Sequence, residues 1–203
     1  MNVAVIFAVF PLIFVGELPD KTALAALVMG SRYRASWVFA GVAAAFLMHV
    51  VIAVALGQLL SLAPRRIVEL VVGILFLLGA VLLLRESKDA EEETDDAGAE
   101  RASAELAGKP ATFRRVAGTA FGVIAVAELG DLTQILTANM AAKYHDPFAV
   151  GIGSTLALWA VGGLAIVGGK NLLRVIPLTL VTRLAALVMA GLAAYSIVES
   201  ATG

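Results

Sequence analysis

Two pairs of carboxylates, each in the middle of a long apolar segment, constrain this chain more than any other feature of its sequence. The pairs are Glu17 and Asp20 in the stretch ELPDKT, and Glu128 and Asp131 in the stretch ELGDLT. Holding one charge at the centre of a bilayer costs about 2.5–3.5 kcal/mol on insertion scales, so acids at that depth are functional candidates. Two matching pairs predict one site built from both halves of the chain.

The composition indicates an integral membrane protein. Of the 203 residues, 60% are hydrophobic, against roughly 45–50% in soluble domains, and the mean hydropathy is +0.92. A membrane-spanning helix needs about 20 apolar residues. Six spans are predicted, at residues 3–29, 36–61, 67–84, 116–141, 148–169 and 175–198, with polar clusters such as Lys170 to Arg174 between them. We therefore expect an all-α protein with six transmembrane helices.

A polar segment divides the chain into two halves. Residues 87–112 hold eight of the 16 Asp and Glu residues, no aromatic residue and few large apolar ones. Such a segment buries too little surface to offset the entropy of ordering, so we expect an acidic, disordered linker. Four further acids lie near predicted span ends, which leaves only the four motif acids inside the membrane. Residues 1–86 and 113–203 are then expected to form two three-helix repeats.

The two halves can be aligned with each other without gaps. The alignment that matches Glu17 with Glu128 also matches Asp20 with Asp131, and Thr22 with Thr133; we call it the repeat alignment. With three spans per half, the second repeat must enter the membrane from the opposite side, as in many secondary transporters that bind substrates near the midplane. Most Lys and Arg residues fall on one side together with the linker, so the linker is expected in the cytoplasm and both termini outside.

The carboxylate pairs favour a cation site. Residues at i and i+3 share a helix face, so each pair is expected to point one way. Like charges in a low dielectric repel until protons or a cation neutralise them, and hard divalent cations prefer carboxylate, carbonyl and hydroxyl oxygens. Four carboxylates with Lys21 nearby can hold a divalent ion or protons, but not both at full occupancy. This favours exchange of metal ions for protons.

The residues around the acids suggest further oxygen ligands. Pro19 has no N–H, so the carbonyl of Val15 loses its helical partner, and Gly130 loosens the other helix at the matching position. Broken helices in transporters expose carbonyls that coordinate ions.

Four polar side chains beside the acids have two interpretations each. Thr22, Thr133 and Gln134 can add oxygen ligands or hydrogen bonds that support the ligands, whereas threonines in membrane helices more often bond back to their own turn. Lys21 either pairs with an acid of its motif or extends to the cytoplasmic face. His49, in the second predicted span, has no counterpart in the other half, and packing or a hydrogen bond is favoured over a metal role.

The duplicated motif in six spans with an acidic central loop resembles the signature of the calcium:cation antiporter-2 family. That family includes Golgi manganese/calcium–proton exchangers and bacterial manganese exporters. Two positions depart from the family pattern, since Pro19 stands where the family has Gly and Leu132 where it has Lys or Arg. The resemblance implies export of Mn²⁺, or of Ca²⁺, from the cytoplasm across a prokaryotic cytoplasmic membrane, with metal ions, protons and the bilayer as partners.

Several other classes are disfavoured. The absence of cysteine excludes disulfides and thiolate metal sites, no basic patch suggests nucleic acid, and no nucleophile–base motif suggests an enzyme, so no cofactor is expected besides the transported ion. Two rivals stay open. An exporter of a small organic cation, such as a basic amino acid, would need a larger cavity, and a non-transporting membrane scaffold would tolerate neutralisation of the acids.

Overall fold

The computed structural model describes residues 2–17, 21–62 and 110–175, together with Pro64 and separate residues between 70 and 106 and between 187 and 201. The described residues are helical apart from short connections, and no strand occurs among them. The helices with complete bounds are α1 (Val3–Glu17), α2 (Lys21–Arg32), α3 (Ala35–Leu60), α6 (Phe113–Ala127), α7 (Leu132–Tyr144) and α8 (Pro147–Val175).

The helix bounds repeat along the chain. The repeat alignment carries α1, α2 and α3 onto 114–128, 132–143 and 146–171, which agree within a few positions with α6, α7 and α8. The first and fourth predicted spans are therefore not single helices. Each consists of two helices that meet at an acidic motif.

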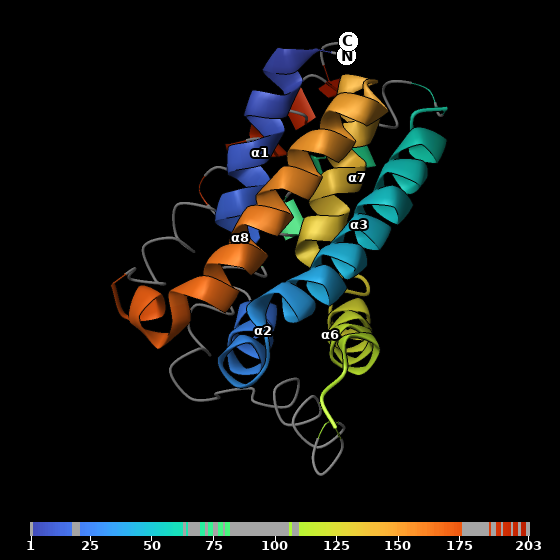
Figure 1. Cartoon of the computed structure of the whole chain (residues 1–203). Coiled ribbons are helices and arrows are strands. Elements are labelled where there is room, and N and C mark those ends of the chain that lie inside the picture. Colours follow the sequence, from blue (N-terminus) through green and yellow to red (C-terminus); the bar gives the residue numbers. More distant parts are fainter. Residues whose placement is uncertain are drawn as a thin grey trace.

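The two sets of three helices run in opposite directions. In Figure 1, α1 lies above α2, whereas α6 lies below α7 although it precedes α7 in the chain. The long helix α3 rises from the lower end of the molecule to the upper end, and α8 descends from the upper end.

Each long helix packs on the broken helix of the other half: α3 contacts α6 and α7, and α8 contacts α1 and α2. Glycines permit the close approach. A β-carbon on Gly41 of α3 would collide with the carbonyl oxygen of Ala117 in α6, and one on Gly153 of α8 would lie 3.2 Å from the carbonyl oxygen of Ile6 in α1. Ile6 and Ala117 are matched by the repeat alignment, so the two contacts are near-equivalents.

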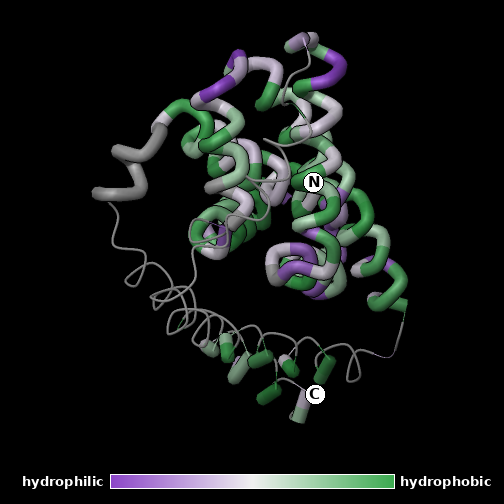
Figure 2. The backbone as a smooth tube through the Cα atoms, turned by 90° about the horizontal axis from the view of Figure 1, so that it is seen from below, coloured by the Kyte–Doolittle hydropathy of each residue, from purple (hydrophilic) through white to green (hydrophobic). Residues whose placement is uncertain are grey.

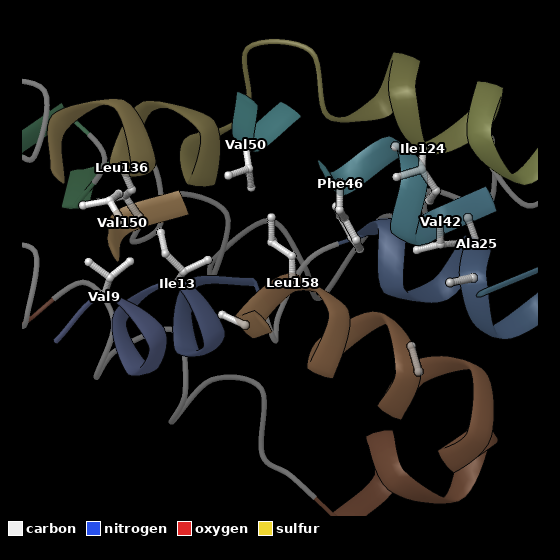
Figure 3. Packing of buried hydrophobic residues seen from close by; sticks show 14 of the residues in the cluster. Val9, Ile13, Ala25, Val42, Phe46, Val50, Ile124, Leu136, Val150 and Leu158 are labelled. Atoms are coloured by element: carbon white, nitrogen blue, oxygen red, sulfur yellow. The ribbon is translucent and has the colours of Figure 1, made fainter. Parts of the chain in front are cut away.

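Residues of the buried core are also matched in pairs by the repeat alignment. Figure 3 shows Ile13 and Leu136 in one group of side chains, and Ala25 and Ile124 in another. The repeat alignment matches Ile13 with Ile124, and Ala25 with Leu136. The interior therefore consists of two similar α1–α7 and α2–α6 contacts, crossed by α3 and α8.

The outer faces of the long helices are apolar. Large hydrophobic side chains are exposed at helical spacing on both; they are Leu47, Val51, Leu56 and Leu59 of α3, and Phe148, Ile152, Leu156, Leu164 and Val167 of α8. Figure 2 shows hydrophobic residues along most of the helical chain and hydrophilic residues in short stretches. Within the described residues, Ala35–Leu60 and Pro147–Gly168 are long and apolar enough to cross a membrane, and exposed apolar area of this kind is typical of a membrane-facing surface.

One predicted span end is wrong, and other predicted segments are described only in part. The polar cluster from Lys170 to Arg174 does not interrupt the helix, because α8 continues through Val175. The cluster contains neither proline nor glycine after Lys170, so nothing in it breaks a helix. The predicted bounds of the third span, 67 and 84, lie outside the described residues, as do most residues between 176 and 198 and most of the linker. Leu106 in the linker is helical and buried.

Candidate metal centre

The second motif forms a sharp break between α6 and α7. Glu128 is the C-cap of α6 and Asp131 is the N-cap of α7. Between them Gly130 has φ +79°, a conformation that glycine adopts without a steric penalty. The Asp131 carboxylate accepts hydrogen bonds at Oδ2 from the backbone N–H of Thr133, at 3.1 Å, and from its hydroxyl, at 3.2 Å. An aspartate in this position stabilises the start of a helix.

The break corrects one step of the sequence argument. Glu128 and Asp131 do not share the face of one helix, because the helix ends between them. They approach each other across a turn in which the Asp131 N–H donates to the Glu128 carbonyl at 3.2 Å. The sequence also predicts that Gly130 loosens the helix, whereas in the structure the helix ends at this motif.

The first motif is described in part. Glu17 is the last residue of α1 and Lys21 is the first residue of α2. The Thr22 hydroxyl donates to Glu17 Oε1 at 3.5 Å, and Val15 lies half-buried near the end of α1. Pro19, Asp20 and the side chain of Lys21 lie outside the described residues.

Acids from the two motifs converge. Glu17, Glu128 and Asp131 each place a carboxylate oxygen so that all three oxygens lie within 4.8 Å of one another. Glu17 is 1% exposed and Glu128 2%, while Asp131 is half-buried. The helices α1 and α7 are neighbours at this point: a β-carbon on Gly16 would be in ordinary van der Waals contact with the Thr133 methyl carbon, at 3.8 Å.

The electrostatics of this cluster require a compensating charge. Three carboxylates at this separation repel strongly when their surroundings exclude water. A divalent cation at their centre, or protons on the acids, would relieve the repulsion. The oxygen-only set suits hard cations such as Mg²⁺, Ca²⁺ and Mn²⁺.

A histidine from α3 reaches the same break. His49 is 3% exposed; its Nε2 lies 3.1 Å from the carbonyl oxygen of Ala125, and its Nδ1 lies 3.3 Å from Nε2 of Gln134. Gln134 Oε1 in turn accepts from the Gly130 N–H at 2.8 Å. The preference for a hydrogen bond over a metal role at His49 agrees with this geometry, but its link to the motif was missed. Both partners lie in the other half of the chain, and only their chemical type could have suggested the contact.

Comparison with known proteins places the chain in a family. The family described as "Divalent cation/proton antiporter GDT1" matches residues 5–91 and 116–203, which is most of the chain and includes both acidic motifs. This chain belongs to the GDT1 family. The resemblance drawn from the motifs is thereby confirmed, and with the apolar helices it identifies an integral membrane protein.

Relatives in the GDT1 family come from bacteria and plants. The "GDT1-like protein sll0615" of Synechocystis is 32% identical, over 78% of this chain and 80% of its own length. "Protein PAM71, chloroplastic" of Arabidopsis thaliana is 30% identical over 80% of this chain, but over 48% of its own length. "GDT1-like protein 4" of Oryza sativa is 27% identical over 82% of this chain and 63% of its own length. This GDT1 chain therefore spans less than two thirds of these plant proteins. No solved structure matches it.

Proposed function

We propose that this protein is a secondary transporter that exports Mn²⁺, with Ca²⁺ as a second substrate, from the cytoplasm in exchange for protons. Glu17, Asp20, Glu128 and Asp131 are the proposed ion-binding carboxylates. The proposal goes beyond the family's description in naming the ions, the direction and the residues. It treats the chain as a carrier rather than an enzyme, with the metal ion as its substrate and no resident cofactor.

The convergence of Glu17 with Glu128 and Asp131 carries this proposal. Buried carboxylates of one sign are costly, and a scaffold would gain nothing from gathering them at the contact of two helix breaks. An organic cation would need a wider apolar cavity, whereas three oxygens within 4.8 Å suit a single ion.

Exchange follows from the limited charge that the site tolerates. The metal-loaded site has its carboxylates neutralised by the cation, and the metal-free site is neutralised by protons. Protons entering from outside would then displace the metal outward, and the protonated site would return to the cytoplasmic side. An empty, fully ionised site is the costly state, which couples the two fluxes.

Nearby hydroxyls support the carboxylates. The hydroxyls of Thr22 and Thr133 donate to Glu17 and Asp131, so we assign them to orienting the acids. Val15 would add its carbonyl oxygen where α1 ends, and Lys21 would offset the negative charge of its motif. Gln134 acts on the backbone of the break.

The membrane arrangement is part of the same proposal. We infer six spans in two inverted three-helix repeats, with both termini outside and the acidic linker in the cytoplasm. The opposite directions of the two helix sets support it. Such repeats can rock against each other around a central site.

The test is ion flux in liposomes that contain the purified protein. We expect Mn²⁺ or Ca²⁺ movement to drive a pH change of the opposite sense, and Glu128→Gln to abolish both. Glu100→Gln, the same chemical change in the acidic linker, is the matched control and should transport normally. If wild-type protein moves neither ion, or if Glu128→Gln transports as well as Glu100→Gln, the proposal is wrong.

A further inference from the structure

The break between α6 and α7 releases two backbone groups from helical hydrogen bonding. In a continuous helix the carbonyl of Ala125 would accept from Leu129, and the N–H of Gly130 would donate to Val126. The Leu129 N–H instead donates to the carbonyl of Val126 at 3.4 Å, and the Gly130 N–H donates to the side chain of Gln134. Ala125 is half-buried and Gly130 is exposed on the protein surface. At membrane depth a released backbone group needs a new hydrogen-bond partner even there.

The side chains of His49 and Gln134 form hydrogen bonds with both the Ala125 carbonyl and the Gly130 N–H. The Gly130 N–H can only donate, so the atom of Gln134 that it meets must be the carbonyl oxygen Oε1, at 2.8 Å. The Gln134 amide nitrogen then donates to His49 Nδ1 at 3.3 Å. Because Nδ1 accepts, Nε2 carries the proton of the neutral ring and donates to the carbonyl of Ala125, at 3.1 Å. Each of these three hydrogen bonds therefore joins one donor to one acceptor.

We propose that His49 is a positioning residue for the metal centre, which it holds in shape through Gln134 and Ala125. The inference rests on the proposed function and deepens it. Glu128 and Asp131 flank Gly130, so the angle between α6 and α7 sets the separation of their carboxylates. His49 ties both sides of that angle to α3, which runs past the break as one uninterrupted helix.

The first motif has no equivalent of the His49–Gln134 hydrogen bonds, and the residues at the matching positions explain why. The repeat alignment matches Gly130 with Pro19, Gln134 with Ala23, and His49 with Ala160. Proline has no N–H, so the first motif has no donor at this position that needs an acceptor. The second motif has such a donor and also has the two side chains that satisfy it. The two motifs therefore differ in a consistent way: Pro19 replaces the N–H that would need an acceptor, and His49 occurs only in the half that contacts the motif with Gly130.

The first experiment measures Mn²⁺ transport in liposomes by three variants. His49→Ala removes both hydrogen bonds and should raise KM for Mn²⁺ by about 10- to 100-fold, the range for partners that orient metal ligands. His49→Gln keeps one donor and one acceptor and should restore KM to within a few-fold of wild type. Gln58→Ala is the matched control, because Gln58 also lies on α3 and donates to a carbonyl of α7, that of Ala141, away from the break.

A second measurement does not depend on transport. Hydrogen–deuterium exchange of the segment 128–134 should be faster in His49→Ala than in wild type or His49→Gln, and unchanged in Gln58→Ala. If wild-type protein transports no metal, the proposed function fails, and the exchange measurement still decides whether His49 holds the break.

Two results would overturn the inference. One is His49→Gln as defective as His49→Ala in a folded protein, which would mean that the imidazole itself is needed. The other is wild-type KM and wild-type exchange in His49→Ala, which would mean that the chain of hydrogen bonds does not set the geometry. A double variant, His49→Ala with Gln134→Ala, should be no worse than either single variant, since both break one chain.

Discussion

The carboxylates of Glu17 and Glu128 lie within 4.8 Å of each other although they belong to opposite halves of the chain. Each lies where the first helix of a broken pair ends, so the two helix breaks meet at their acidic residues. This contact turns two separate sequence signals into one candidate site with a defined set of oxygens.

Neutralising one of these acids should stabilise the metal-free protein and remove its response to metal. At pH 8 we expect Glu128→Gln to unfold at a higher temperature than wild type, because one of three mutually repelling charges is gone. Mn²⁺ at about a hundred times its Kd should stabilise wild type by about 2.7 kcal/mol and the variant far less. Thermal unfolding in detergent, with and without Mn²⁺, measures both. Equal metal shifts in the two proteins would contradict the assignment.

Gly57→Ala should separate α3 from α7. The added β-carbon would collide with the carbonyl oxygen of Ala138 and lie 2.7 Å from the Ala141 β-carbon. We expect a loss of about 1–3 kcal/mol, the usual cost of overpacking. Gly122→Ala in α6 is the control: a β-carbon there meets nothing within 4 Å, and the gain in helix propensity is up to about 1 kcal/mol. Comparable losses in the two variants would show that α3 does not pack this closely.

Gly130→Ala should damage the site more than the fold. Alanine at φ +79° carries a strain of about 1–2 kcal/mol, and relief of that strain would rotate Asp131 away from Glu128. We expect a modest fall in unfolding temperature but a large rise in KM for Mn²⁺. Gly118→Ala, with nothing near its β-carbon, should change neither quantity in that direction. A wild-type KM in Gly130→Ala would show that the backbone turn is not needed to hold the acids.

Asp146 gives a prediction about pH. The backbone N–H groups of Ala149 and Asn2 donate to its carboxylate and lower its pKa from 3.8. A folded-state pKa below the unfolded one stabilises the protein above pH 3.8, and this contribution is lost as the pH falls through the lowered value. Asp146→Asn should therefore be less stable than wild type at pH 7, with a difference that narrows towards pH 3. A constant difference across this range in unfolding measurements would contradict the role of the charge.

The sequence predicted the parts of this structure that depend on repetition. The alignment that relates Glu17 to Glu128 also relates the helix bounds, and it predicted that acids of the two motifs would face one site; Glu17 lies with Glu128 and Asp131 as that implies. Their role as metal ligands stays a prediction, and so does that of Asp20, which lies outside the described residues.

The local geometry of the site could not be predicted in the same way. Periodicity placed Glu128 and Asp131 on one helical face. Whether the helix continues depends on the conformation of a single residue, Gly130, and a long apolar stretch of sequence gives no sign of that conformation. The contact of His49 with Gln134 depends on how α3 crosses α7. The two helices pack closely at Gly57, and no local sequence pattern specifies that crossing.

The most direct test is the number of Mn²⁺ ions bound per purified chain, measured by calorimetric titration of wild type, Glu17→Gln and Glu128→Gln. One site formed by both halves predicts one ion per chain in wild type and strongly weakened binding in either single variant. Two ions per chain, with each variant losing only one of them, would contradict a shared site.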